Sequence, residues 1–389
     1  MSAAYDAVVI GAGPAGCAAA YDLVAAGRSV LLVDQRAFPR VKACAGGVTV
    51  KTLRALRYSI APVIREVCSE MVVARGYERA RTLASNDPLC AMTVREELDA
   101  YCLRQTVARG AEFRIAKRIA AVVEDETGVD VTLDDEPVRA RYLVAADGVN
   151  SRVRQLLGGA PPVRGFALEA CVARERAAIP PMVFQFGVVE AGYGWLFPKG
   201  DHVNVGLYTN DPAVRISRDD VAAFAERKLG TDALTGFVGH HIGLGGCELT
   251  QPWRRVFLVG DAAGLVDPLL GEGIYNAIVS GQAAARAIAE ATAPAAASAK
   301  SVFARYLAPI VADLASTYRT ARFFYKHLVW GFRALTFPPS ELALMRGTAA
   351  GLTFSQAKHG FLLAPFRRAP QIDSIAEWQR FRQEETRDR

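Results

Sequence analysis

Residues 5–16 read Tyr5-Asp-Ala-Val-Val-Ile10-Gly11-Ala-Gly13-Pro-Ala-Gly16. The short apolar run before the glycines predicts a buried parallel strand. The alanine-rich stretch that follows predicts a helix ended by Gly27, and residues 29–33 predict a second strand that ends in Asp34. The chain therefore opens with a βαβ unit that has G-x-G-x-x-G at its first turn and an acid 18 residues past the last glycine.

This turn predicts dinucleotide binding. The first two glycines allow a tight turn and the close approach of a pyrophosphate, and the third lets the helix pack on the strand. The helix N-terminus would face the phosphates, and Asp34 would take the ribose hydroxyls. The motif alone does not separate NAD from FAD. The candidate contacts are Gly11, Gly13, Pro14, Ala15, Gly16, Asp34, Gln35 and Arg36.

Two later stretches favour FAD, because they predict a long ligand with several polar sections. Residues 142–148 predict a strand that ends in Asp147 and Gly148, and residues 256–261 predict another that ends in Gly260 and Asp261. Acids at the carboxyl ends of strands suit sugar or ribityl hydroxyls. The helix expected from Ile274 to about Ala291 would turn its N-terminus toward an electron-rich ring edge. Asp147 is also interpretable as an ordinary turn acid.

This order of motifs resembles the FAD-binding domain shared by glutathione-reductase-type and aromatic-hydroxylase-type flavoproteins. The resemblance implies that Asp261 meets the ribityl–pyrophosphate region and that Gly271 and Gly273 lie by the pyrimidine end of the isoalloxazine. It also implies that Arg95 reaches the flavin chain and that the strand at Ile119 meets adenine. The same resemblance adds Cys44, Ala45, Gly148, Gly260 and Ile274 to the candidate cofactor contacts.

Three motifs resemble those of the geranylgeranyl reductase family of flavoproteins. They are Pro39-Arg-Val-Lys-Ala-Cys44-Ala45-Gly-Gly-Val, Tyr193-Gly-Trp195-Leu-Phe197-Pro-Lys199 and Gly271-Glu-Gly273-Ile-Tyr-Asn-Ala-Ile-Val-Ser-Gly281. The first departs from the family pattern at Ala45, where many members have glycine. Membership implies the reduction of carbon–carbon double bonds in isoprenoid or lipid-like chains, by hydride transfer from reduced FAD.

The electron donor stays open between NAD(P)H and another reductant. Residues 243–246 contain glycines, but we expect no convincing strand before them and no helix after them, so a second nucleotide-binding unit is not predicted.

The candidate catalytic residue is Cys44, which family members place close to the flavin. It is interpretable as a proton donor or gate, or as a small apolar filler in a tight loop. Tyr193, Trp195 and Phe197 alternate and therefore share one strand face, as a wall of the substrate cavity or as ordinary core. Lys199 is read as a salt-bridged loop residue or as a substrate contact.

Three rival functions stay open. The first is an FAD-dependent monooxygenase of the aromatic-hydroxylase type, which shares the order of the FAD-domain motifs. The second is a related flavin halogenase, although the chain has no W-x-W-x-I-P. The third is a non-enzymatic electron-relay flavoprotein.

The expected fold is α/β (α+β overall), with a discontinuous Rossmann-type FAD-binding domain in residues 1–160 and 250–295. An antiparallel-sheet substrate domain would occupy residues 161–249, joined by about 65–92. Residues 296–389 would form a helical region broken at Pro309, Pro338, Pro339, Pro365 and Pro370.

The charge distribution singles out the C-terminal region. The chain of 389 residues has a net charge of +6, and residues 300–389 carry 14 basic and 7 acidic residues. Residues 300–370 also hold 12 of the 34 aromatic residues. This stretch is interpretable as a solvated helical face, or as a surface that caps the substrate cavity and meets a membrane. Without a matching fold, the charge does not indicate nucleic-acid binding.

Several classes are not expected. No apolar run reaches the length of a membrane span, and the N-terminus does not resemble a secretory signal. The seven cysteines form no C-x-x-C pair, and the five histidines share no spacing with carboxylates, so no metal site is predicted. His240 and His241 are read as a strand end. We expect a cytoplasmic protein, peripheral at the inner face of the membrane if the basic stretch contacts lipid.

Overall fold

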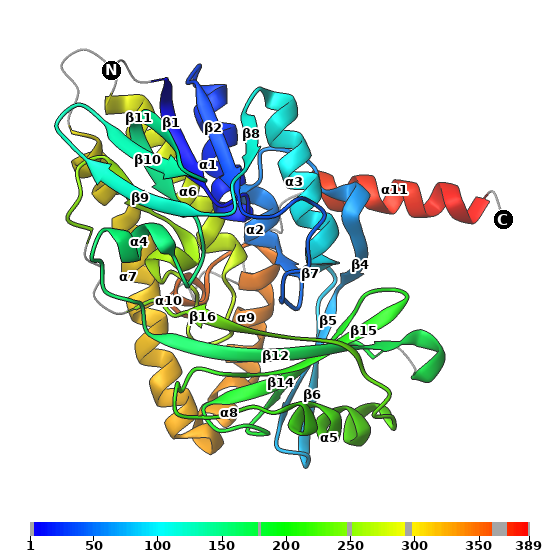
Figure 1. Ribbon diagram of the computed structural model, residues 1–389. Helices are drawn as coiled ribbons and strands as arrows, with labels where there is room; N and C mark the ends of the chain where they lie inside the picture. The colour runs from blue at the N-terminus through cyan, green and yellow to red at the C-terminus, as the bar shows by residue number, and fades with distance from the viewer. Residues whose placement is uncertain (1–3, 178–179, 247–250, 292–297, 360–371, 388–389) are drawn as a thin grey trace. The chain divides into compact units, whose positions relative to one another are not determined.

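The computed structural model describes residues 4–177, 180–246, 251–291, 298–359 and 372–387. The chain forms two compact units, each assembled from three stretches (Figure 1). Unit 1 comprises Met1–Arg40, Asp99–Val163 and Ile242–Ala315, and unit 2 comprises Val41–Leu98, Arg164–His241 and Ser316–Arg389. The domain boundaries expected from the sequence stay a prediction.

Unit 1 is built on a seven-stranded sheet in the order β8-β2-β1-β11-β10-β9, with β17 paired to β11. From β8 to β11, and on to β17, the strands are parallel, whereas β10 is antiparallel to its neighbours. Ile10, Ala145 and Leu258 share one row, so the carboxyl ends of three strands meet at one edge. The strands are β1 (Tyr5–Ile10), β2 (Val30–Asp34), β8 (Glu112–Ile115), β9 (Ile119–Glu124), β10 (Val129–Leu133), β11 (Glu136–Ala145) and β17 (Val256–Leu258).

The helices of unit 1 include two that pack closely, α1 and α6 (Figure 1). A Cβ on Gly281 would lie 2.2 Å from the carbonyl oxygen of Ala15, so only glycine allows this approach. α6 has the span that the sequence predicts. The helical elements here are α1 (Pro14–Ala25), α4 (Arg152–Leu156), η3 (Gly260–Ala263) and α6 (Ile274–Ala291). Two more are shared with unit 2: α3 (Arg95–Arg109) begins there, and α7 (Ala299–Lys326) ends there.

Unit 2 holds a seven-stranded sheet in the order β16-β12-β15-β14-β13-β5-β6, and a small sheet β3-β7-β4. The sequence predicts β-rich runs at residues 163–174, 183–189, 193–197 and 202–208, and all four form strands. β13 pairs with β5 in parallel, so the sheet is not purely antiparallel. The strands are β3 (Gly47–Thr49), β4 (Ile64–Cys68), β5 (Glu70–Arg75), β6 (Arg79–Ala84), β7 (Cys90–Thr93), β12 (Arg164–Ala173), β13 (Met182–Phe186), β14 (Gly192–Pro198), β15 (His202–Thr209) and β16 (Thr235–Gly243).

One prediction about β16 is wrong. Gly243 does follow a strand, because it is the last residue of β16, whose ladder also contains His240 and His241. The sequence reads His240 and His241 as a strand end, but the apolar and polar residues of this segment alternate too weakly to show that the strand continues to Gly243. Residues 244–246, the described residues directly after β16, form no helix.

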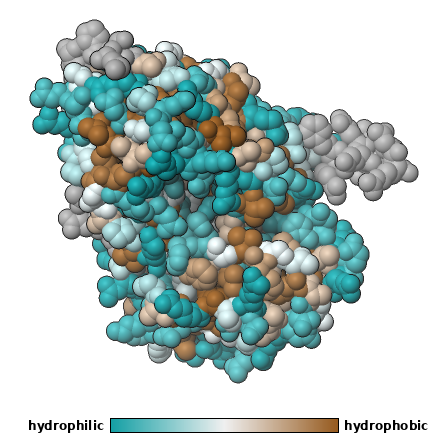
Figure 2. Space-filling model, viewed as in Figure 1, coloured by the Kyte–Doolittle hydropathy of each residue, from teal (hydrophilic) through white to brown (hydrophobic). Residues whose placement is uncertain are grey.

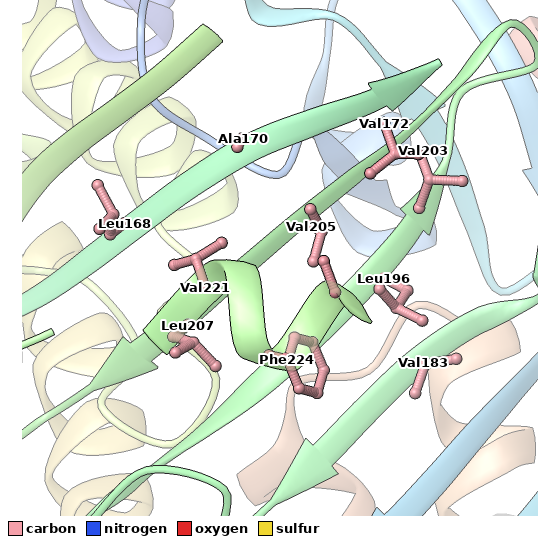
Figure 3. Close-up of a cluster of buried hydrophobic side chains, with 11 residues drawn as sticks. Leu168, Ala170, Val172, Val183, Leu196, Val203, Val205, Leu207, Val221 and Phe224 are labelled. Carbon is pink, nitrogen blue, oxygen red and sulfur yellow. The ribbon is translucent and has the colours of Figure 1, made fainter. Parts of the chain in front are cut away.

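The core of unit 2 lies between the sheet and α5 (Arg218–Leu229), which Ser217 and Asp220 begin with a capping box. Val221 and Phe224 of α5 point onto residues such as Val205 and Leu196 of the sheet (Figure 3). The opposite side chains of the same strands therefore form the other face of the sheet.

The C-terminal region is helical, as predicted, but Pro309 does not break it. Pro309 lies inside α7, and a long helix tolerates the loss of one backbone donor when the rest of its ladder is intact. Pro338 and Pro339 open α9, where a missing N–H is harmless. Pro365 and Pro370 lie outside the described residues. The remaining helices are α2 (Val50–Ala55), η1 (Ala61–Val63), η2 (Arg174–Arg176), α8 (Leu328–Leu335), α9 (Pro338–Ala349), α10 (Phe354–His359) and α11 (Asp373–Arg387).

Among the described residues, no helix combines the length and apolarity needed to cross a membrane. Figure 2 shows one face of the molecule, on which hydrophobic residues are interspersed among hydrophilic ones.

Candidate functional site

In the glycine-rich turn of unit 1, the fold requires glycine at two positions but not at a third. A Cβ on Gly11 would lie 2.3 Å from the oxygen of Ala146, and one on Gly16 would lie 1.7 Å from the oxygen of Gly11. A Cβ on Gly13 would meet only an arginine nitrogen, that of Arg40, at 3.7 Å. Gly13 also has an ordinary φ of −79°. The chain itself therefore does not require glycine at residue 13, and a pyrophosphate that approaches this backbone does.

Asp34 ends β2 beside this turn and is buried. Its carboxylate accepts hydrogen bonds from the backbone N–H of Ala12 at 2.9 Å and of Arg36 at 3.0 Å. Arg40 pairs with Asp34 at 3.7 Å and with the buried Asp99 at 3.3 Å. Arg40 was missed by the sequence analysis, because an arginine in a loop carries no periodic signal. The side chains of Gln35 and Arg36 are exposed.

The second strand end, after β11, leaves a buried oxygen for a ligand. Asp147 accepts a hydrogen bond from the N–H of Val153 through Oδ2 at 3.1 Å. Its Oδ1 is buried and has no hydrogen-bond partner among the described residues. Burial raises the pKa of this carboxyl. A buried oxygen of this kind is normally satisfied, and a sugar hydroxyl would satisfy it. Gly148 follows with φ of +79°.

Arg154 ties this strand end to the third and was also missed. It is buried, and its guanidinium donates to the carbonyl oxygens of Val149 and of Ala262 in η3. The contact spans more than a hundred residues of sequence, so no local pattern could have revealed it.

The third strand end leads from β17 through η3 to α6. The N–H of Gly260 donates to Ser280 Oγ at 3.0 Å, and a Cβ on Gly273 would lie 3.4 Å from Asp261 Oδ1. Gly271 has φ of +66°, and Ile274 is the first residue of α6. Asp261, Gly271 and Gly273 therefore gather at the N-terminus of α6, where a helix favours electron-rich groups. Together with the open approach at Gly13 and the unsatisfied Asp147 oxygen, this edge fits FAD.

Ile119 is the first residue of β9. Its carbonyl oxygen accepts from Arg152 Nε at 3.4 Å. Its contact with adenine stays a prediction.

The remaining predicted residues belong to unit 2, on the sheet face opposite α5. Tyr193, Trp195 and Phe197 are buried along β14 on one face, as the alternation predicts. The ring of Phe184 in β13 lies 5.5 Å from that of Tyr193 and 5.3 Å from that of Phe197. Their role as a substrate wall stays a prediction.

Polar groups occupy the same face beside these rings. The register of β12, β15 and β14 puts Glu169, Gly206 and Trp195 in one row. A Cβ on Gly206 would lie 2.3 Å from the Trp195 ring, so the indole covers this glycine. Trp195 Nε1 donates to Asn204 Oδ1 at 2.7 Å, which fixes the ring.

The Cys44 loop is bonded to this polar end. The N–H of Cys44 donates to Glu169 Oε1 at 2.9 Å, and Lys199 Nζ donates to the carbonyl oxygen of Ala45. Lys199 is buried and forms none of the ion pairs found among the described residues, contrary to its reading as a salt-bridged loop residue. Burial lowers the pKa of Lys199 to about 8 and raises that of Glu169. The sequence analysis did not single out Glu169.

Arg95 is buried at the start of α3 and is one of the positive charges that lower the pKa of the His240 imidazole. Burial is the largest cause, and together with the nearby positive charges it brings that pKa to about 3, so His240 is neutral at ordinary pH. No cluster of potential metal ligands occurs among the described residues.

Comparison with a family model of FAD binding domains gives a match over residues 4–170. The chain is 32% identical over 357 residues to an uncharacterised protein of Methanosarcina barkeri, covering 91% of this chain and 92% of that one. It is 32% identical to a menaquinone reductase of Mycolicibacterium smegmatis, over 73% of this chain and 76% of that one. It is 28% identical to a digeranylgeranylglycerophospholipid reductase of Methanopyrus kandleri, over 74% and 77%.

Solved structures share the fold. A geranylgeranyl bacteriochlorophyll reductase-like protein of Thermoplasma acidophilum superposes with a TM-score of 0.71 at 22% identity, covering 96% of this chain and 98% of that one. A flavin-dependent brominase superposes with a TM-score of 0.70 at 18% identity, over 97% and 100%.

Proposed function

The chain belongs to the geranylgeranyl reductase family of FAD-dependent oxidoreductases, and from this premise we propose that it reduces carbon–carbon double bonds of an isoprenoid or lipid-like substrate. The names of its reductase relatives support this substrate class. The observation that carries the proposal is the buried face of β14, where aromatic rings run into the polar group of Cys44, Glu169 and Lys199.

The chemistry of an isolated alkene explains why such a face is useful. FAD, when reduced, supplies the hydride for one alkene carbon. The other carbon needs a proton, and water must be excluded because no carbonyl group stabilises developing charge. Tyr193, Trp195 and Phe197 would hold and desolvate the hydrocarbon chain. Cys44, in the loop beside them, would donate the proton.

The residues of unit 1 would hold the cofactor. The turn at Gly13 would take the pyrophosphate, and Asp34 and Asp147 would accept hydrogen bonds from hydroxyl groups. Asp261 would meet the ribityl chain, and the N-terminus of α6 would face the pyrimidine end of the ring. NAD(P)H or another donor would supply the electrons without a second glycine-rich nucleotide unit.

The test is anaerobic turnover. The FAD-loaded protein, chemically reduced and mixed with lipids that carry geranylgeranyl chains, should give product two mass units heavier per double bond reduced. A flavin that is reoxidised by none of these substrates under anaerobic conditions would overturn the proposal.

A flavin monooxygenase or halogenase is the second candidate, favoured by the fold shared with the brominase. It predicts oxygen consumption stoichiometric with reductant and product, or a product that depends on halide. The same anaerobic experiment separates it from the reductase, because an oxygen-dependent enzyme gives no product without oxygen.

We also propose that unit 2 meets a lipid surface at the inner face of the membrane. The end of α7, α8 and the start of α9 expose Phe323 (58%), Trp330 (66%) and Phe337 (57%). Exposed basic residues lie among them. Aromatic side chains prefer the membrane interface, and basic ones attract anionic headgroups. This basic–aromatic surface comprises Arg322, Phe323, Lys326, Val329, Trp330, Arg333 and Phe337. The predicted segment at 361–368 lies outside the described residues.

A further inference from the structure

The sheet face opposite α5 is made mostly of aromatic rings, and one position within it is a glycine. The strand register places Gly206 of β15 directly opposite Trp195 of β14. A Cβ on Gly206 would lie 2.3 Å from Cζ2 and 2.4 Å from Cη2 of Trp195, so the indole occupies the space that a side chain at residue 206 would need. The neighbours of this pair on the same face include Phe184, Phe186, Tyr193, Phe197, Asn204 and Tyr208.

A hydrogen bond holds the indole over this glycine. Trp195 Nε1 donates to Asn204 Oδ1 at 2.7 Å, and the two residues are buried, with exposed fractions of 3% and 6%. An indole N–H can only donate, so the oxygen of the amide must face the ring. Because the indole has no other polar atom, loss of Asn204 would leave the rotation of the ring to packing alone.

Asn204 is an unusual residue for an aromatic face. It lies in one row with Phe197 of β14 and Cys171 of β12. Burial of an amide among rings costs free energy, and an apolar residue would pack there without that cost. A buried polar group can instead select one arrangement among several. Here it selects one orientation of the indole among the rotamers that the backbone allows.

We propose that Asn204 is a positioning residue for Trp195, and that it thereby determines which double bonds of an isoprenoid chain are reduced. With the ring held over Gly206, the face offers a hydrocarbon chain one fixed surface. Hydride transfer needs the reacting atoms about 3–3.5 Å apart, so a surface displaced by about 1 Å presents the wrong carbon. This consequence for the product rests on the proposed function, whereas the hold of Asn204 on the ring does not.

The first measurement is hydrogen exchange at the indole N–H of the folded, FAD-loaded protein. The chain has four tryptophans, and the Trp195 signal in a proton–nitrogen correlation spectrum is the one that Trp195→Phe removes. Asn204→Leu removes the acceptor, so this N–H should exchange about fivefold faster, the factor that corresponds to about 1 kcal/mol of hydrogen-bond free energy. Asn204→Asp keeps an acceptor oxygen and should keep the slow exchange.

The second measurement is the product pattern of anaerobic turnover with lipids that carry geranylgeranyl chains. Mass spectrometry counts the remaining double bonds, and ozonolysis locates them. Asn204→Leu should lower the share of the main wild-type product about fivefold, because the ring leaves its position by that factor more often. The remainder should be spread over chains with other numbers or positions of double bonds. The FAD content should not change.

Gln185 supplies the matched control. It is a buried amide of β13, and it alternates with the rings so that it shares the α5 face with Val183. Gln185→Leu therefore makes the same chemical change on the opposite face of the same sheet. It should lower stability and leave the product pattern as in the wild type, which is also what a merely structural Asn204 predicts for Asn204→Leu.

An unchanged product pattern in a folded, active Asn204→Leu protein would overturn the proposal, and so would unchanged indole exchange. If that variant does not fold, Asn204→Ser decides in its place, because the serine side chain is one bond shorter and leaves the indole without its acceptor. In Trp195→Phe, which has no N–H, the further change Asn204→Leu should have no effect on the product pattern. Faster indole exchange in a protein whose wild type reduces no alkene would contradict the proposed function and the consequence for the product, and would leave the hold of Asn204 on the ring confirmed.

Discussion

Gly13 offers the sharpest test at the scale of single residues. Its Cβ would meet only Arg40 at 3.7 Å, so the fold should accept a side chain there. Gly13→Val should therefore fold but fail to retain FAD, because the added side chain occupies the space that a pyrophosphate needs. The measurement is the flavin absorbance of the purified protein together with its circular dichroism.

Gly16 supplies the matched control for this substitution. A Cβ on Gly16 would lie 1.7 Å from the oxygen of Gly11, so Gly16→Val should lose stability and not only flavin. A yellow, stoichiometrically loaded Gly13→Val protein would refute the interpretation of the turn.

Cys44 is the second residue whose role one substitution decides. Cys44→Ala should retain FAD and lose most alkene reduction, because the loop keeps its backbone bonds while the proton donor is gone. Flavin reduction by the electron donor should stay at the wild-type rate. Cys102→Ala, at a buried cysteine of unit 1, serves as control. Turnover that is unaffected by Cys44→Ala would leave this cysteine as a filler of the loop.

Site residues that belong to a local sequence pattern could be identified from the sequence, whereas those with distant partners could not. Gly11, Gly13 and Asp34 belong to one local βαβ pattern, so the sequence placed them at one turn. Glu169 reaches Cys44 across 125 residues, and Arg154 reaches Ala262 across 108. Such partners meet only after the strands have paired, and a charged residue in a strand looks like any solvated position before then.

At the scale of elements, the contact between α5 and the sheet determines the stability of unit 2. The ring of Phe224 is fully buried, and a Cβ on Gly194 of β14 would lie 2.6 Å from it. Phe224→Ala should lower the free energy of unfolding by about 3–5 kcal/mol, since it removes the contacts and leaves a cavity. Urea denaturation followed by tryptophan fluorescence measures the loss.

An exposed apolar residue gives the comparison for that variant. Val123→Ala, at a side chain of β9 in unit 1, should change the free energy of unfolding by no more than about 0.5 kcal/mol. A Phe224→Ala protein as stable as Val123→Ala would mean that α5 does not cover the sheet as Figure 3 shows.

Elements were more predictable than their pairing. The strands β12 to β15 followed from β-rich runs separated by Gly, Pro and Asp, and α6 followed from an alanine-rich stretch. The parallel pairing of β13 with β5 did not, because Met71 and Met182 lie far apart in the sequence and no local pattern encodes strand direction. Pro309 was misread because the rule for proline is local, whereas α7 extends from Ala299 to Lys326 and so continues well beyond Pro309 on both sides.

At the scale of the whole molecule, the charge of the chain is concentrated at one end of the sequence. Residues 300–389 carry 14 basic and 7 acidic residues, although the net charge of the whole chain is only +6. The first 299 residues are therefore close to neutral and contain all of the cofactor motifs. The described part of residues 300–389 is mostly helical and supplies none of the FAD contacts predicted from the sequence. A role of the excess charge in partner binding is therefore a simpler explanation than a role in the reaction.

The basic–aromatic surface allows the uneven distribution of charge to be tested. Reversing Arg322, Lys326 and Arg333 to Glu should weaken binding to phosphatidylglycerol vesicles on the order of 100-fold, at roughly 1 kcal/mol for each basic residue near the surface. Vesicle co-sedimentation measures the affinity. The flavin content should not change, because these side chains belong to none of the predicted FAD contacts.

A control variant at three exposed arginines elsewhere in unit 2 distinguishes the effect of this surface from the effect of net charge. Reversal of Arg79, Arg176 and Arg215 changes the net charge by the same amount, so long-range attraction falls equally in both variants. Only the first variant also removes charge that lies among exposed aromatic rings. The contribution of the rings themselves is tested by Trp330→Ser, which should weaken vesicle binding in high salt, where the attraction between charges is screened. Equal losses of vesicle affinity in the two triple variants would mean that binding depends on the net charge of the protein and not on this surface. A wild-type protein that never sediments with the vesicles would leave residues 322–337 a solvated face, and the lipid substrate would then have to reach the enzyme from solution.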